Sequence, residues 1–199
     1  VINTIEADDV IEKITIIRIG NAAKKFDAVK IFKNYYSSVA KEIKEAEEKA
    51  QQITENKIKE ITTLKATGTK TKSGLVYQII KKGTGKKPAN GTQVLIHYAG
   101  YLENGQLFDT SYEDVAKLYG KFDQNRANQN GYAGFPVTIG NLPFIPGFNE
   151  GVNLMNYGDK LMLYIPSNLG YGEQGAGDAI PPNANIIFEV ELLENKSTN

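Results

Sequence analysis

The sequence predicts an α+β protein, in which an antiparallel sheet is covered by one short helix and preceded by a long helix. Two observations indicate this class. Apolar residues recur at spacings of three and four from Val29 to Ile53, as on one side of an α-helix. From Gly74 onward the pattern changes to short alternating or β-branched runs bounded by turn residues, which is typical of strands. We therefore divide the chain into an N-terminal strand segment at 1–20, a helix with its linker at 21–72, and a domain at 73–199.

Composition excludes several kinds of site and partner. The chain has no Cys, so disulfides and thiolate metal sites are ruled out. Lys plus Arg and Asp plus Glu both number 23, so the net charge is zero and gives no reason to expect nucleic acid or an anionic membrane as a partner. No apolar run is long enough to span a bilayer. No motif indicates a phosphate loop or a calcium loop, and we expect neither a metal nor a cofactor.

The first twenty residues predict a turn followed by a strand. A β-branched stretch runs from Val10 to Ile19 and ends at Gly20. Residues 1–20 also resemble the closing segment of bacterial cyclophilins. Because the chain starts at Val1 without a basic-then-apolar leader, we expect a fragment or a processed product, with a cyclophilin-like domain upstream.

Residues 27–66 predict one long helix, for which Asp27 is an N-cap candidate. Its apolar stripe comprises Val29, Phe32, Tyr36, Val39, Ile43, Ala46, Ala50 and Ile53. An exposed stripe of this length needs a partner, and two alternatives remain open. The helix is either a linker partly packed on its own domain or the interface of a coiled-coil or antiparallel homodimer. Residues 67–73 have the composition of a linker.

The last domain predicts six strands and one helix in antiparallel order. The strands are expected at 76–80, 94–102, 106–110, 135–139, 160–165 and 186–193, and the helix at 147–155. Asn104-Gly105 gives a strong hairpin signal between two of the strands. Residues 112–134 predict a helical first half up to Phe122 and a polar loop after it.

Four segments of this domain share one longer pattern. They read VLIHYAGYL at 94–102, GQLFDTS at 105–111, IPGFNEGV at 145–152, and IPPN at 180–183 leading into IIFEVEL at 186–192. In this order, over about residues 74–193, they resemble the FKBP family of peptidyl-prolyl isomerases. The resemblance implies a bent antiparallel sheet wrapped over a short helix, with the site between the two.

The resemblance also implies the site residues. The catalytic residues would be Tyr98, Asp109 and Tyr171. The substrate-binding residues would be Phe108, Phe135, Phe144, Ile145, Phe148, Ile180 and Phe188. The Ile145 N–H and the Tyr171 hydroxyl are the expected donors to substrate carbonyls. Asp109 would either orient a substrate carbonyl electrostatically or accept a hydrogen bond from Tyr98.

Two positions depart from the common family pattern. Phe148 stands where Trp is common in the pocket floor, and Ala176 stands where an aromatic residue or His is common. The resemblance also implies that residues 112–134 contain an insertion relative to the minimal members of the family, and that this insertion borders the pocket rim. We expect substrate preference to be decided at these places.

The function expected from this sequence is peptidyl-prolyl cis-trans isomerisation that assists protein folding. Rotation of an X–Pro bond disrupts amide resonance but breaks no bond to carbon, so a pocket without a nucleophile suits it. The alternative is a non-catalytic FKBP-like chaperone or binding module that dimerises through the 27–66 helix. The expected partners are proline-containing polypeptides and macrolide inhibitors. The expected location is the cytoplasm, with the periplasm as the alternative.

Overall fold

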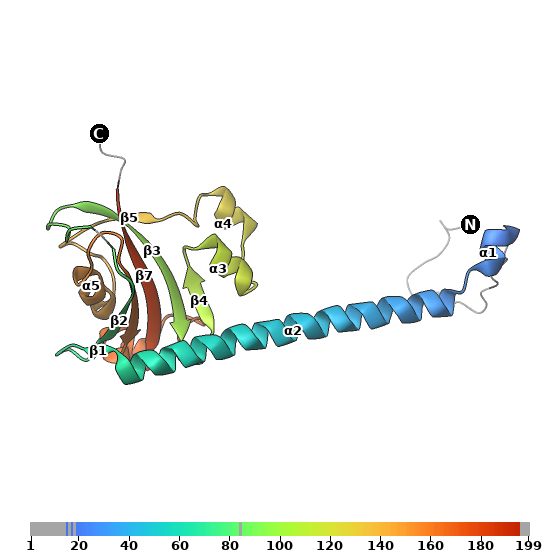
Figure 1. Ribbon diagram of the computed structural model, residues 1–199, viewed down its shortest axis with the longest axis horizontal. Helices are drawn as coiled ribbons and strands as arrows, with labels where there is room; N and C mark the ends of the chain where they lie inside the picture. The colour runs from blue at the N-terminus through green and yellow to red at the C-terminus, as the bar shows by residue number, and fades with distance from the viewer. Residues whose placement is uncertain (1–14, 16, 18, 84, 196–199) are drawn as a thin grey trace. The chain divides into compact units, whose positions relative to one another are not determined.

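The computed structural model describes residues 15, 17, 19–83 and 85–195 (Figure 1). The helices are α1 (Gly20–Lys25), α2 (Ala28–Thr67), α3 (Glu113–Leu118), α4 (Gln124–Asn128) and α5 (Pro146–Asn153), with short 3-10 turns η2 (Ser167–Leu169) and η3 (Gly172–Gln174). The strands are β1 (Thr69–Lys70), β2 (Val76–Lys81), β3 (Gln93–Leu102), β4 (Leu107–Thr110), β5 (Phe135–Thr138), β6 (Lys160–Ile165) and β7 (Ile186–Glu194). None of the helices in these ranges is both long enough and apolar enough to cross a membrane.

Helix α2 begins at the predicted cap. The Lys30 N–H donates to Asp27 Oδ1 at 3.0 Å, which satisfies one of the amides that a helix leaves unpaired in its first turn. The chain divides into two compact units between Ala46 and Glu47, inside this helix. In the first unit the apolar stripe is exposed, with Phe32 at 59% of its maximum.

The end of α2 belongs to the second unit and packs on its sheet. Ile61 and Leu64 are 3% and 0% exposed, in a cluster that includes Met162 and Ile187. The helix is therefore packed on its own domain at this end, as one of the two sequence alternatives expected. This packing also explains why the compact unit begins at Glu47, whereas the sequence predicted a domain starting at residue 73.

The sheet is antiparallel throughout, in the order β1-β2-β6-β7-β3-β4, and β5 pairs with the first half of β3. Its longest pairing is between β3 and β7, from Val94 opposite Glu194 to Leu102 opposite Ile186. The predicted hairpin joins β3 to β4. Gly105 has a φ of +79°, which glycine adopts without the strain of a Cβ, and its N–H donates to the Leu102 carbonyl at 2.9 Å.

Both faces of the sheet are covered, since α5 and α3 lie on opposite sides of β3 and β7 (Figure 1). Strand β3 alternates between them. Val94 and Ile96 face the core beneath α5, whereas Ala99 and Tyr101 face the cluster formed with the end of α2 and with the insertion. We call the α5 side the inner face and the opposite side the outer face. The sequence predicted the helix on the inner face and left open whether the long helix packs on the same domain.

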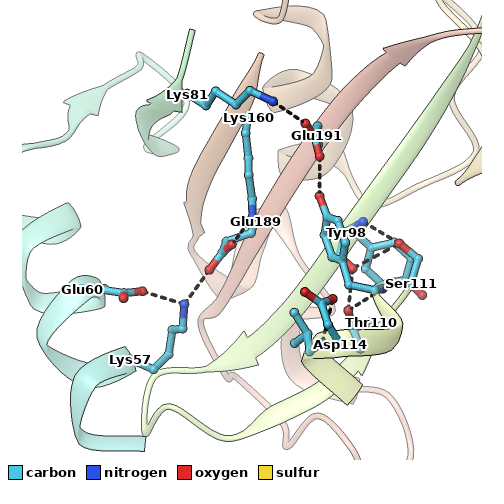
Figure 2. A network of polar contacts seen from close by, with 12 residues as sticks. Lys57, Glu60, Lys81, Tyr98, Thr110, Ser111, Asp114, Lys160, Glu189 and Glu191 are labelled. Atoms are coloured by element: carbon cyan, nitrogen blue, oxygen red, sulfur yellow. Dashed lines mark hydrogen bonds and ion pairs between the residues drawn. The ribbon is translucent and has the colours of Figure 1, made fainter. Parts of the chain in front are cut away.

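Charged side chains tie the end of α2 to the outer face of β7 (Figure 2). Lys57 Nζ lies 2.5 Å from Glu189 Oε1 and 2.6 Å from Glu60 Oε2, and Lys160 Nζ lies 2.8 Å from Glu189 Oε2. The side chains of Lys57 and Glu189 are only 11% and 13% exposed. Burial alone would lower the pKa of Lys57, but the two carboxylates outweigh it and raise that pKa. The ion pair therefore remains charged inside the packed layer.

The outer face also buries tyrosine hydroxyls. Tyr101 lies under Lys57, with Nζ 4.5 Å from the ring centroid, and the Tyr112 hydroxyl donates to Glu191 at 3.0 Å. Burial and the neighbouring carboxylates, Glu189 for Tyr101 and Glu191 for Tyr112, raise the pKa of both hydroxyls.

We predict that these groups make the fold sensitive to alkali. A tyrosine whose pKa is raised in the folded state keeps its proton after the unfolded chain has lost it. Its contribution is thus complete below the unfolded pKa of about 10 and declines as the pH rises towards the folded value. Lys57 acts in the same direction. Denaturant unfolding should show a free energy of unfolding that falls steadily above about pH 10. The fall should be smaller in Tyr112→Phe, and an equal slope in that variant would contradict this assignment.

Three expectations need correction or fall outside the described residues. The predicted N-terminal strand lies mostly outside them, and Thr15, Ile17 and Ile19 belong to no strand. The 67–73 linker contains β1, because Thr69 and Lys70 pair with β2. The polar second half of the insertion is not a plain loop. It contains α4, because the Asp123 side chain accepts hydrogen bonds from the amides of residues 125 and 126 and starts a helix there.

Candidate active site

A pocket of about 580 Å³ opens between α5 and the inner face of the sheet. It is lined by Tyr98, Phe108, Asp109, Phe135, Pro143, Phe144, Ile145, Phe148, Tyr171 and Phe188. Nine of the ten residues predicted for the site are therefore brought together, from β3, β4, β5, β7, the loop before α5, α5 itself and the turn between η2 and η3. Most of this lining is aromatic, so a ligand here would meet apolar ring faces and edges.

The rings hold one another edge to face. Phe148 is central, with its centroid 5.1 Å from that of Phe144 and 5.0 Å from that of Phe188. Phe108 lies 5.4 Å from Phe188 on the other side. Such edge-to-face pairs stabilise by about 0.5–1.5 kcal/mol each beyond their buried area, and they fix the ring orientations. Phe148 is 4% exposed and so belongs to both the pocket floor and the core.

Gly100 makes room for two of these rings. It pairs with Phe188 on β7 and Asp109 on β4, and a Cβ there would lie 2.5 Å from Phe108 Cε2 and 2.9 Å from Phe188 Cε1. Real Cβ atoms do not approach other atoms this closely. The absence of a side chain at this position therefore sets how deep the pocket wall lies.

We predict that Gly100→Ala damages the pocket more than the fold. Overpacking of this kind costs about 1–3 kcal/mol of stability, and it must displace Phe108 or Phe188 into the pocket. Peptide isomerisation per folded molecule should then fall severalfold. The control is Gly68→Ala at the end of α2, where a Cβ would lie 2.6 Å from Val76 Cγ1, away from the pocket. That variant should lose stability but keep its activity, and an equal loss of activity in both variants would contradict the interpretation.

A chain of polar contacts forms one edge of the pocket. The Tyr98 hydroxyl donates to Asp109 Oδ2, and Arg126 Nη1 donates to Asp109 Oδ1 at 2.6 Å. Burial and the hydrogen bond to this carboxylate raise the pKa of Tyr98 well above its usual value, so the hydroxyl keeps its proton and remains a donor. Asp109 was expected either to orient a substrate carbonyl or to accept a hydrogen bond from Tyr98, and the structure contains that hydrogen bond.

The loop before α5 is fixed by Asn149. Its Nδ2 donates to the carbonyls of Leu142 at 3.1 Å and Phe144 at 2.9 Å. These bonds hold Phe144 and Ile145 at the pocket mouth, where Ile145 is also the N-cap residue of α5. No sequence motif singled out this asparagine.

Tyr171 also lines the pocket and is 38% exposed. Its hydroxyl has no hydrogen-bond partner within the described ranges, so it is available to a ligand. His97 does not line the pocket. It lies on the outer face, stacked on Tyr112 at 4.8 Å, with Nδ1 3.1 Å from Ser111 Oγ.

Ile180 is the one predicted site residue that does not line the pocket. Its backbone pairs with Ala176, with the Ala176 N–H donating to the Ile180 carbonyl at 2.8 Å, and its side chain is 3% exposed in the core. The bridge turns this side chain inward, under the pocket wall. The sequence in turn missed Pro143 and Arg126, which line or complete the site. Arg126 could have been suspected only from the capping Asp123 three residues earlier, which places it in a helix beside the pocket rim.

No cluster of three or more metal-binding side chains occurs in the part of the chain that the structure describes. What the pocket offers is an apolar aromatic box with hydrogen-bond donors at its edge.

Residues 84–193 match the model of the family described as FKBP-type peptidyl-prolyl cis-trans isomerase. The chain belongs to this family. The predicted membership of the FKBP family is thus confirmed. The predicted α+β fold and the isomerase domain are confirmed with it.

Relatives of known name agree with it. The chain is 43% identical over 124 residues to a probable FKBP-type peptidyl-prolyl cis-trans isomerase FkpA of Neisseria meningitidis, covering 62% of this chain and 39% of that one. It is 36% identical over 194 residues to the FKBP-type peptidyl-prolyl cis-trans isomerase FkpA of Aeromonas hydrophila, covering 85% and 65%. The second match includes residues before the family model begins. The chain spans less than two thirds of the length of either relative.

A solved FKBP has the same fold. The crystal structure of AtFKBP13 superposes with a TM-score of 0.52 at 27% identity, and it covers 64% of this chain and 98% of that one. The FKBP domain is therefore the shared part, and the long α2 helix lies largely outside it.

Proposed function

We propose that this chain is a folding factor that accelerates cis–trans rotation of X–Pro bonds in client polypeptides, and that the aromatic pocket does so without covalent chemistry. The observation that supports this is the pocket itself. Aromatic rings make up most of the wall around a volume of about 580 Å³, and few of the lining residues carry polar side chains.

The chemistry of the reaction fits such a pocket. The barrier of about 18–20 kcal/mol arises from amide resonance, which is lost at the twisted midpoint. A twisted amide is less polar than a planar one and loses less on leaving water, so an apolar pocket favours it over the ground state. In this proposal Phe148 and Phe188 hold the proline ring while the preceding carbonyl rotates.

Two donors would receive the rotating and flanking carbonyls. They are the Ile145 N–H at the start of α5 and the Tyr171 hydroxyl, both from residues that line the pocket. The Tyr98 hydroxyl is committed to Asp109, so we assign this pair to fixing the pocket edge electrostatically. No proton has to leave the substrate, and Asp109 is not a general base here.

A peptide isomerisation assay and a proline-limited refolding assay test the proposal together. We expect acceleration of both by micromolar protein, and a lower rate in Asp109→Ala. Wild-type protein that accelerates neither would refute the catalytic function and leave the non-catalytic binding module. If Asp109→Ala retains the full rate, the Tyr98–Asp109 pair does not contribute to catalysis.

We also propose that the chain forms a homodimer through the first part of α2. The exposed side chains Val29, Phe32, Tyr36 and Ile43, at 78%, 59%, 65% and 54% exposure, support this because they form one apolar stripe. Sedimentation of the full chain tests it. Phe32→Glu with Tyr36→Glu should give monomers, whereas the control pair Asn34→Glu with Ser38→Glu, on the other side of the helix, should not. A wild-type chain that sediments as a monomer would refute the proposed homodimer.

The remaining expectations stand as proposals. We propose binding of macrolide inhibitors in the same pocket, which competition with a prolyl peptide would test. We propose a cytoplasmic location, which fractionation of the native cells would test against a periplasmic one. The cyclophilin-like character of residues 1–20 is also a proposal, and the full-length gene sequence would decide it.

A further inference from the structure

The 112–134 insertion builds a second pocket directly beside the first. It has a volume of about 400 Å³, and it shares Tyr98 and Phe135 with the aromatic pocket. Its other lining residues are Ser111, Arg126, Gln129, Asn130, Gly131, Ala133, Gly134 and Pro136. We call it the polar pocket, because amide, hydroxyl and guanidinium groups replace the aromatic rings here.

Arg126 is the charged residue in this lining, and it is held firmly. Its Nε donates to the Gly131 carbonyl at 3.0 Å, its Nη1 donates to Asp109 at 2.6 Å, and its guanidinium carbon lies 5.0 Å from the centre of the Tyr132 ring. A Cβ at Gly131 would lie 2.5 Å from Arg126 Cγ, so the bare backbone there lets the side chain lie flat. The guanidinium is thus preorganised, and its position does not depend on a ligand.

These contacts use only part of the guanidinium. Asp109 and Gly131 take some of its N–H donors, and the side chain remains 35% exposed where it lines the polar pocket. Gln129 and Asn130 add exposed amide groups, and no acidic side chain lines this pocket. The polar pocket therefore presents neutral amide donors and the remaining N–H donors of a guanidinium that is already paired with Asp109, and such charge-assisted donors suit a carboxylate.

The two pockets lie within reach of a single extended peptide. The rings of Tyr98 and Phe135, which form their common wall, are 5.6 Å apart between centroids. Pockets that share two side chains adjoin, and an extended chain advances only roughly 3.3 Å per residue, so residues a few positions apart in one peptide can occupy both.

We propose that the polar pocket is a specificity subsite that accepts an acidic side chain of the client, a few residues from the proline held in the aromatic pocket. This proposal rests on the proposed isomerase function. It assigns the insertion a role in selecting sequences around the proline, and it makes Arg126 the residue that determines the selection.

The test is isomerisation of a peptide series by the full chain. Each peptide carries one proline, with Glu, Gln, Ala or Lys placed two or three residues before or after it. At one of these positions we expect kcat/KM for Glu to exceed that for Ala and Lys by about three- to tenfold, in line with a partly exposed charge-assisted contact. The advantage should shrink as salt is raised.

Variants identify the group responsible. Arg126→Met should bring the Glu-to-Ala ratio to about one, and because the ratio is compared within each variant, a general loss of activity does not affect it. Gln129→Glu, at an exposed position, should reverse the preference towards Lys. The control is Lys117→Met, which removes a positive charge from the same insertion but from outside the polar pocket and should keep the wild-type ratio.

The outcomes separate the subsite from the isomerase function. Wild-type protein that is active on all peptides but shows no preference for Glu at any position would overturn the subsite alone. A preference that survives in Arg126→Met would also overturn it. Failure to accelerate any peptide would instead overturn the isomerase function on which it rests.

Discussion

Phe148→Ala is expected to lose both most of the catalytic rate and a large part of the stability. Removing a buried Phe leaves a cavity and costs about 3–5 kcal/mol. The ring also contacts Phe144 and Phe188 edge to face, so its removal frees two more walls of the pocket. We expect kcat/KM for a prolyl peptide to fall on the order of 10- to 100-fold, since each factor of ten corresponds to about 1.4 kcal/mol of transition-state binding.

A matched variant on the outer face separates the two effects. Met162 is also 4% exposed, but it packs against the end of α2. Met162→Ala should cost about 2–5 kcal/mol and leave the rate per folded molecule unchanged. Urea titration gives the stability, and the peptide assay is run well below each variant's midpoint. If Met162→Ala slowed catalysis as much as Phe148→Ala, the pocket floor would not be the cause.

Lys57→Met is expected to lower the stability strongly although it lies outside the pocket. It leaves Glu189 buried with only Lys160 to neutralise it, and breaking a buried ion pair from one side costs about 3–5 kcal/mol when no partner remains. Because Lys160 remains, we expect about 2–3 kcal/mol here. The loss should appear as a lower urea midpoint with little change in the peptide assay.

The neighbouring pair on the same helix provides the control. Lys65 Nζ lies 2.6 Å from Glu103 Oε1, a distance as short as the Lys57 contacts, but the two side chains are 47% and 36% exposed. Lys65→Met should therefore cost no more than about 1 kcal/mol. A second variant, Lys57→Met with Glu189→Gln, should recover part of the loss, because it removes the uncompensated charge. Equal costs for Lys57→Met and Lys65→Met would show that burial does not decide the strength of these pairs.

Much of the domain could be predicted from local sequence signals. The strand patterns predicted β3 and β7, and Asn104-Gly105 predicted the hairpin between β3 and β4. The apolar stripe that follows Asp27 predicted α2. Each signal depends on residues close together in the chain, where backbone preferences act directly. The pocket rings were found by the family pattern, which records which strand positions face inward.

Two site residues that the sequence analysis placed wrongly or overlooked share a physical reason. The side chain of Ile180 was expected in the pocket, but a backbone bridge to Ala176 turns it into the core. Arg126 was not predicted as a site residue, because its contact with Asp109 depends on how the insertion folds back towards β4. A polar residue in a polar segment gives no local sign of such a contact.

The sequence by itself determined the longer strands, the long helix and the hairpin, since period, capping and turn chemistry are local, and the family pattern indicated the aromatic residues around the pocket. The tertiary structure alone decided that the end of α2 covers the outer face and that Lys57 meets Glu189, 132 residues away. It also decided that the insertion places Arg126 at the pocket edge. Contacts at this separation depend on how whole elements pack, and a buried charge pair or a polar subsite exists only where two such surfaces meet.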